Sequence, residues 1–272
     1  MFIKKIITII LAILMITNTT FATGSDFIVS GSADQSIVKK EFENDGLLKA
    51  YAYYKNENGN MKYVPVENIT SPVENEVQVG MIKIIWDLAK ETIPEGLLNE
   101  IDYIIIEEHR NVDNLMTISS DNPRNEKFNI HLDAILTYNL GRLQNELAAA
   151  AVMMFILDTS EVDFNKKRGT NYKFNNLYYK DESFINIFYE KFWKGRKQEN
   201  TETLYERYPR EFLSKEASFN VYTDMAVSFM TYMRKGYNDN TNAVTNAKQN
   251  FFDNYEEFRY LANILRRNMR LN

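Results

Sequence analysis

The chain has only two histidines, and each lies close to carboxylates. His109 follows Glu107 and Glu108 at the end of an apolar run, and His131 lies two residues before Asp133. Imidazole and carboxylate groups act as general acids and bases, or bind a metal ion, when they converge. One hypothesis for a site is therefore that the two histidines, Glu107 and Asp133 form a cluster across neighbouring strands. The alternative is that both histidines face solvent at the edges of a sheet.

The histidines do not have the spacing of a helical zinc site. Two His side chains four residues apart on a helix point the same way and hold one Zn²⁺, with a third protein ligand from elsewhere in the chain. No His-x-x-x-His pair exists here, and the chain has no cysteine. We therefore expect no bound metal, no cofactor, no thiolate metal site, no disulfide and no lipoprotein anchor.

The element around which the chain is organised is the apolar stretch within Leu143–Asp163. Its middle, Leu147–Leu157, has no charge, no Gly and no Pro, and it is rich in the strong helix formers Ala, Met and Leu. It is shorter than the roughly 20 residues that cross a bilayer. This composition predicts a helix, within Ala134–Leu157, that is buried on all sides.

The N-terminal half is expected to form a small sheet packed against helices, which is an α+β fold. Strands are expected at Phe27–Val29, at Leu47–Tyr54 and Met61–Val66 as a hairpin around the turn Asn56–Asn60, and at Ile101–Ile106, Leu115–Ser119 and Lys127–Leu132. Helices are expected at Val77–Lys90 and Pro94–Asn99. The last strand alternates between apolar and polar residues, so His131 is expected on its polar face with Asn129 and Asp133.

The C-terminal half is expected to be helical. Helices are predicted at Ser183–Lys194 with Ser183 as N-cap, at Val221–Arg234, and as one long helix over Ala243–Arg270; Thr159–Lys180 is predicted to be a polar loop. The arginines near the end of the last helix lie where the negative end of the helix dipole favours cations. We prefer this interpretation to that of a basic binding patch.

The N-terminus has the pattern of a secretory signal peptide. Lys4 and Lys5 precede the apolar run Ile6–Ile16, and small residues lead to a cleavage site at Ala22. Removing the two lysines takes the formal charge from −5 to −7. We expect a secreted or cell-envelope protein with no stable membrane span after cleavage and no nucleic-acid partner. An uncleaved membrane anchor is the alternative.

Several short blocks between about Met81 and Met269 resemble a family of secreted bacterial zinc metallopeptidases of the zincin type. The blocks are Ile85–Leu88 with Ile93 and Pro94, Asp181–Trp193, Tyr208 and Pro209 with Phe212, Ser214, Ala217 and Asn220, Thr223–Phe229, and Lys248 with Phe251, Phe252 and Tyr255. In the family the central helix reads Thr-Leu-Ile-His-Glu-Phe-Gly-His-Leu-Leu-Thr-Leu-Asn, and it aligns without a gap on Glu146–Asp158.

The resemblance places apolar or neutral residues at every chemical position. Ala149 and Met153 occupy the two zinc-ligand His positions, and Ala150 occupies that of the general-base Glu. On the later helix, Thr223 and Val227 replace the two glutamates of the family. The resemblance therefore implies a zincin-like scaffold over residues 76–272, after a lead-in and hairpin at residues 23–75, without zinc or catalytic residues.

Three functions are consistent with these features. The first is an exported, catalytically inactive metallopeptidase-like protein that binds a protein or peptide partner. The second is an active metal-dependent hydrolase or peptidase with a rearranged site around the two histidines, and the third is a structural surface protein. Asp224, next to a lost ligand position, is expected to be a surface charge or a buried hydrogen-bond partner rather than a ligand.

Overall fold

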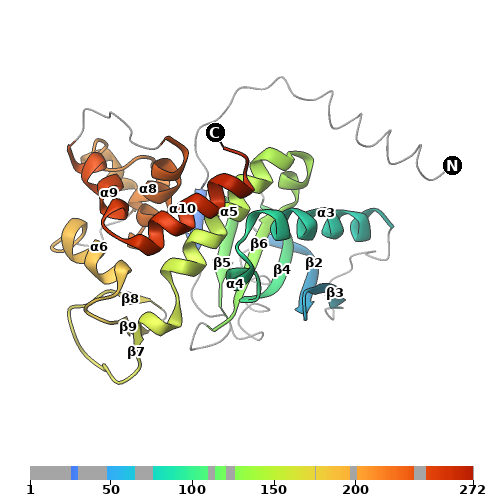
Figure 1. Cartoon of the computed structure of the whole chain (residues 1–272), viewed down its shortest axis with the longest axis horizontal. Helices are drawn as coiled ribbons and strands as arrows, with labels where there is room; N and C mark the ends of the chain where they lie inside the picture. The colour runs from blue at the N-terminus through green and yellow to red at the C-terminus, as the bar shows by residue number, and fades with distance from the viewer. Residues whose placement is uncertain are drawn as a thin grey trace.

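The computed structural model describes residues 26–29, 48–64, 76–109, 114–120, 126–174, 176–196, 201–235 and 243–271. The predicted signal peptide and its cleavage site at Ala22 lie outside the described residues. The fold is α+β, as expected, with a sheet at one end and most of the helices at the other (Figure 1).

The main sheet is mixed and has the strand order β1-β5-β6-β4-β2-β3. Its strands are β1 (Asp26–Val29), β2 (Leu48–Glu57), β3 (Asn60–Val64), β4 (Ile101–His109), β5 (Asn114–Ser119) and β6 (Phe128–Asp133). β6 runs parallel to β4 and antiparallel to β5, so it is an interior strand with a partner on each side. Every strand that the sequence predicted for this sheet is present.

The hairpin of β2 and β3 turns at Asn58 and Gly59, which have φ angles of 53° and 84°. Two positive φ angles are typical of the type I′ turn, whose twist matches that of the strands. The Asn56 side chain accepts a hydrogen bond from the Gly59 N–H at 2.9 Å, and the Trp86 indole donates to the Gly59 carbonyl at 2.9 Å. The turn predicted at Asn56–Asn60 is confirmed, and it is fastened to the neighbouring helix.

Helices α3 (Glu76–Thr92) and α5 (Leu140–Ile156) cover the apolar face of the sheet, with the short α4 (Glu95–Leu98) beside them (Figure 1). α5 follows a 3-10 turn, η1 (Ala134–Tyr138), and the side chain of Asn139 caps its first turn. Its residues from Leu147 to Met154 are completely buried, which confirms the predicted core helix. Among the described residues, Leu140–Glu161 is the one segment long and apolar enough to span a membrane, but 67% of its apolar window is buried inside the protein.

The C-terminal half contains α6 (Phe184–Phe192), α7 (Thr201–Arg207), the 3-10 turn η3 (Glu216–Ser218), α8 (Val221–Lys235), α9 (Ala243–Asp253) and α10 (Glu256–Asn268). α8 packs against α5 as expected. The Ser183 hydroxyl accepts from the Asn186 N–H, so the predicted N-cap of α6 is confirmed. The short helix α7 was not predicted.

The single long helix predicted over Ala243–Arg270 is wrong. The chain breaks between α9 and α10, where Tyr255 adopts an extended conformation with φ −123° and ψ 128°. The break allows the aromatic rings of the two helices to meet, with the centroids of Phe252 and Phe258 5.1 Å apart. Burial of these rings outweighs the cost of ending one helix and starting another.

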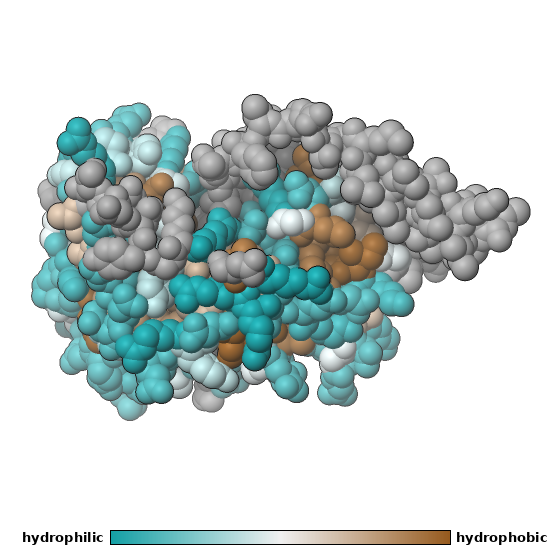
Figure 2. All heavy atoms as spheres, turned by 45° about the horizontal axis from the view of Figure 1, so that its top comes forward, coloured by the Kyte–Doolittle hydropathy of each residue, from teal (hydrophilic) through white to brown (hydrophobic). Residues whose placement is uncertain are grey.

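Most of the surface in Figure 2 is hydrophilic, and hydrophobic residues gather in one patch toward the right of the view. Large hydrophobic side chains that remain exposed in the described parts of the chain include Ile84, Ile135, Tyr138 and Leu140. Three of these four lie within six consecutive residues, at η1 and the start of α5.

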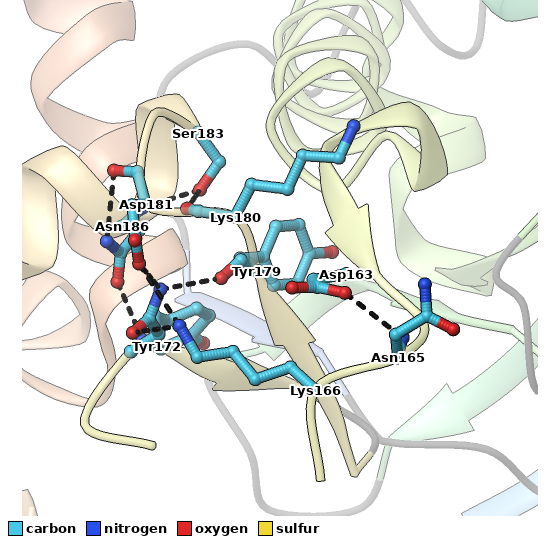
Figure 3. Close-up of polar contacts among 10 residues, drawn as sticks. Asp163, Asn165, Lys166, Tyr172, Tyr179, Lys180, Asp181, Ser183 and Asn186 are labelled. Carbon is cyan, nitrogen blue, oxygen red and sulfur yellow. Dashed lines mark hydrogen bonds and ion pairs between the residues drawn. The ribbon is translucent and has the colours of Figure 1, made fainter. Parts of the chain in front are cut away.

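The segment predicted as the polar loop Thr159–Lys180 instead contains a second, three-stranded sheet. Its strands are β7 (Val162–Asp163), β8 (Lys173–Phe174) and β9 (Leu177–Tyr179), in the order β7-β9-β8. Figure 3 shows the side chains that hold this segment: Lys166 Nζ lies 3.1 Å from Asp181, in the turn before α6, and the Asn186 side chain, in α6, accepts from the Tyr172 N–H at 2.8 Å. Such side-chain contacts order a segment whose composition alone predicts a loop.

The last helix, α10, binds back onto earlier elements. The Arg266 guanidinium donates to the carbonyls of Met233 at 2.6 Å and Tyr232 at 3.3 Å, near the end of α8. The Asn268 amide donates to the carbonyl of Thr92, the last residue of α3, at 3.0 Å. Arg266 therefore satisfies carbonyls at a helix C-terminus, in agreement with a structural role for this arginine.

Candidate functional site

The positions aligned with the metal ligands lie in the core. Ala149, Ala150 and Met153 on α5 and Thr223 on α8 are completely buried, and Val227 is half-buried. The two helices pack against each other. Alanine and valine have no polar atom, and a thioether is a poor ligand for Zn²⁺. The positions on α5 therefore have the composition of a packed core.

One carboxylate remains in α5, one turn before Ala150. Glu146 is 1% exposed, and burial raises its pKa to about 7, although the charges of Arg142 and Arg234 oppose this rise. Its Oε2 atom has no hydrogen-bond partner among the described residues. Glu146 is thus a buried acid that is poorly stabilised in its charged form.

Asp224 is a buried hydrogen-bond partner, the second of the two roles expected for it. Its Oδ2 lies 2.6 Å from Lys248 Nζ on α9 and accepts from the Trp193 indole at 2.8 Å. Both charged side chains are at most 1% exposed. Burial raises the pKa of Asp224 and lowers that of Lys248, since removal from water opposes both charges.

His131 does not face solvent, so the prediction of a solvent-facing histidine at a sheet edge is wrong. It lies in the interior strand β6 and is 7% exposed. All six residues of β6 are buried, which means that the polar face of this strand is covered as well as the apolar face. The alternation of apolar and polar residues within Lys127–Leu132 assigns the side chains to the correct faces of the strand. It does not show that the polar face is also covered.

A line of hydrogen bonds runs from β5 through His131 to β4. Ser119 Oγ lies 2.8 Å from His131 Nε2, and His131 Nδ1 lies 2.6 Å from Glu107 Oε1. A carboxylate can only accept, so Nδ1 carries the proton in this pair, and in the neutral ring Nε2 then accepts from the Ser119 hydroxyl. This is the order of groups by which an imidazole removes a proton from a serine while a carboxylate orients the ring.

The cluster of four residues expected from the sequence therefore forms only in part. Glu107 and His131 meet, but Asp133 Oδ1 accepts from the Ile135 N–H at 2.7 Å and so caps η1. His109 ends β4 opposite Leu48, and its side chain is outside the described part of the structure.

Ser119 was not predicted as a site residue, because its role depends on the register between β5 and β6. In that register Thr117 lies opposite His131 and Ser119 opposite Asn129, so the serine reaches the imidazole diagonally. The only indication of this role in the sequence is a hydroxyl that the strand alternation places on the same face of the sheet as His131.

No group of three or more His, Asp or Glu side chains suited to a metal ion occurs within the described ranges. Comparison with protein-family models, with curated proteins and with solved structures finds no match to this chain.

Proposed function

We propose that this protein is an exported, zincin-like protein that has lost its catalytic zinc site and acts by binding a protein or peptide. The observation that carries the proposal is the complete burial of Ala149, Ala150 and Met153 in α5. In an active zincin these positions would present two imidazoles and a carboxylate to a metal and to water. The order of α3, the mixed sheet, α5 and α8, with α5 against α8, supports the scaffold.

Exposed apolar residues support the binding role. Ile135, Tyr138 and Leu140 are 59%, 66% and 48% exposed, within one short stretch at the start of α5. Large exposed apolar residues that lie close together mark interaction surfaces more often than single, scattered ones do. A partner that covers this stretch would bury these side chains without using the lost site.

Restoring the zinc ligands tests the proposal. The variant Ala149→His, Ala150→Glu, Met153→His, Thr223→Glu places four polar groups at positions that are completely buried. Each unsatisfied group costs about 1–3 kcal/mol, so the sum approaches the total stability of a typical domain, which is about 5–15 kcal/mol. We expect a large fall in the urea midpoint, with part of it recovered in zinc because the metal binds only the folded state.

The matched control omits Met153→His and should not respond to zinc. The single variant Ala149→His supplies a measurable midpoint if the fourfold variant does not fold. Unchanged stability and no zinc response in the fourfold variant would mean that these residues do not converge. One tightly bound Zn²⁺ per wild-type chain, lost in His131→Ala, would instead support a rearranged metal site.

A second candidate function is hydrolysis with Ser119 as nucleophile. It is favoured by the hydrogen-bond line from Ser119 through His131 to Glu107, at 2.8 and 2.6 Å. A fluorophosphonate probe tests it, because the probe forms a stable bond only with an activated serine. Labelling that is lost in Ser119→Ala and His131→Gln but kept in Ser120→Ala would establish this function, since the Ser120 hydroxyl donates to the Lys127 carbonyl. Absence of labelling in the wild type would exclude it.

A further inference from the structure

The ammonium group of Lys248 and the carboxylate of Asp224 are enclosed together between α8 and α9. Nζ is 2.6 Å from Asp224 Oδ2, and the two side chains are 1% and 0% exposed. Nζ also donates to the Glu211 carbonyl at 2.7 Å and lies 4.4 Å from the centre of the Phe212 ring. The Trp193 indole N–H donates to the same Oδ2 at 2.8 Å. The two reactive groups are therefore held in contact with water excluded.

Burial opposes the charge on each member of this pair. It is the largest influence on each group, and it raises the pKa of Asp224 and lowers that of Lys248, while the attraction and hydrogen bond between the two groups act in the opposite direction. The positive charge of Arg196 adds to the lowering of the pKa of Lys248. Transfer of one proton from Lys248 to Asp224 gives a neutral amine beside a neutral carboxylic acid, which removes both buried charges. The neutral amine is the nucleophilic form of lysine.

We propose that Lys248 and Asp224 condense to an intramolecular amide bond that joins α9 to α8. Lys248 Nζ attacks Asp224 Cγ, so that an N–C bond forms. The bond from Cγ to Oδ1 breaks, and Oδ1 leaves as water with the proton of the acid and one proton of the amine. Oδ2 remains as the amide oxygen. The reaction needs no oxidant, reductant or further reactant.

The surroundings suit both the reaction and its product. The Trp193 N–H already donates to Oδ2, where negative charge develops during the attack, and such a fixed donor stabilises that charge. In the product, the amide N–H can keep the hydrogen bond to the Glu211 carbonyl, and the amide oxygen can keep the bond from Trp193. The one donor and one acceptor of the amide are thus satisfied where they form.

The amide would constrain the unfolded chain as a disulfide does, because it closes the loop between α8 and α9. The chain has no cysteine and cannot form a disulfide. A cross-link made from Lys and Asp would survive reduction, and it would hold together two helices whose packing depends on the aromatic residues of α9.

The test is the mass of the purified full chain under denaturing conditions, with the N-terminus read from the same spectra. We expect the wild type to be lighter than its sequence by one water, and a tryptic digest to contain the Lys248 and Asp224 peptides as one joined species. Lys248→Arg, which keeps the charge but not the primary amine, and Asp224→Ala should each show the full sequence mass. A wild-type chain with the full sequence mass and separate peptides would overturn the proposal, leaving an ion pair only.

Discussion

Replacing Glu146 by Gln should stabilise the protein at neutral and alkaline pH. Glu146 is almost completely buried in α5, and its Oε2 has no hydrogen-bond partner among the described residues. Burial raises its pKa from 4.5 to about 7. The folded protein therefore keeps a proton on this side chain over a pH range in which the unfolded chain has lost it. Glutamine has nearly the same shape and carries no charge at any pH.

The sign and size of the effect follow from this difference in pKa. Protonated Glu146 makes its full contribution to the free energy of unfolding below pH 4.5, where the unfolded chain is protonated as well. This contribution is lost as the pH rises through about 7, the pKa in the folded protein. The difference between 4.5 and about 7, at about 1.4 kcal/mol per pH unit, gives a loss of about 3 kcal/mol for the wild type. At pH 8 the free energy of unfolding of Glu146→Gln should exceed that of the wild type by up to this amount. At pH 4 the two should be nearly equal.

Urea unfolding between pH 4 and pH 9 measures both curves, with the exposed Glu257→Gln on α10 as the matched control. The free energy of unfolding of Glu146→Gln should still fall somewhat as the pH rises, because Glu100 has a similar effect. Burial, and secondly the charge of Asp158, raise the pKa of Glu100 to about 7. Parallel curves for Glu146→Gln and wild type would contradict this prediction. They would show that Glu146 is solvated or paired in the folded protein.

Three further predictions concern local features. Ser183→Ala removes the N-cap of α6 and should lower the free energy of unfolding by about 1 kcal/mol; Ser183→Gly should cost less, and equal effects of both would argue against a capping role. Gly59→Ala should lower the free energy of unfolding by about 1 kcal/mol or more, because Gly59 has φ 84°. The space around Gly59 is open, so the variant measures backbone strain without a steric clash, and Gly96→Ala, at a helical position, is the control. Mass mapping of protein expressed in a bacterium should find a mature N-terminus near Thr23, and an intact Met1 on a cytoplasmic protein would contradict export.

The elements predicted well from the sequence are those with local causes. The turn at Asn58 and Gly59 needs two positive φ angles, and Asn and Gly tolerate them. Ser183 caps α6 through its own side chain. The side chains in the apolar run of α5 gain no hydrogen bonds from exposure to water. The burial of this run therefore follows from its composition.

The elements that were missed depend on partners far away in the chain. The break before Tyr255 follows from the meeting of aromatic rings that a continuous helical pattern does not reveal. The small sheet β7-β9-β8 is held by contacts such as that of Lys166 with Asp181. The site around His131 needs the order of β5, β6 and β4, and strand order is not encoded in the alternation of any one strand.

The hydrogen bond from Asn268 to Thr92 has a consequence for the order in which the protein can fold during synthesis. It joins residues 176 positions apart, and Arg266 in the same helix satisfies carbonyls at the end of α8. Contacts of such long range form late, because the chain between them must first be ordered. The carbonyl of Thr92 at the end of α3 is made early but gains this donor only after α10 has been synthesised, so the contact between these two helices can form only when the chain is nearly complete.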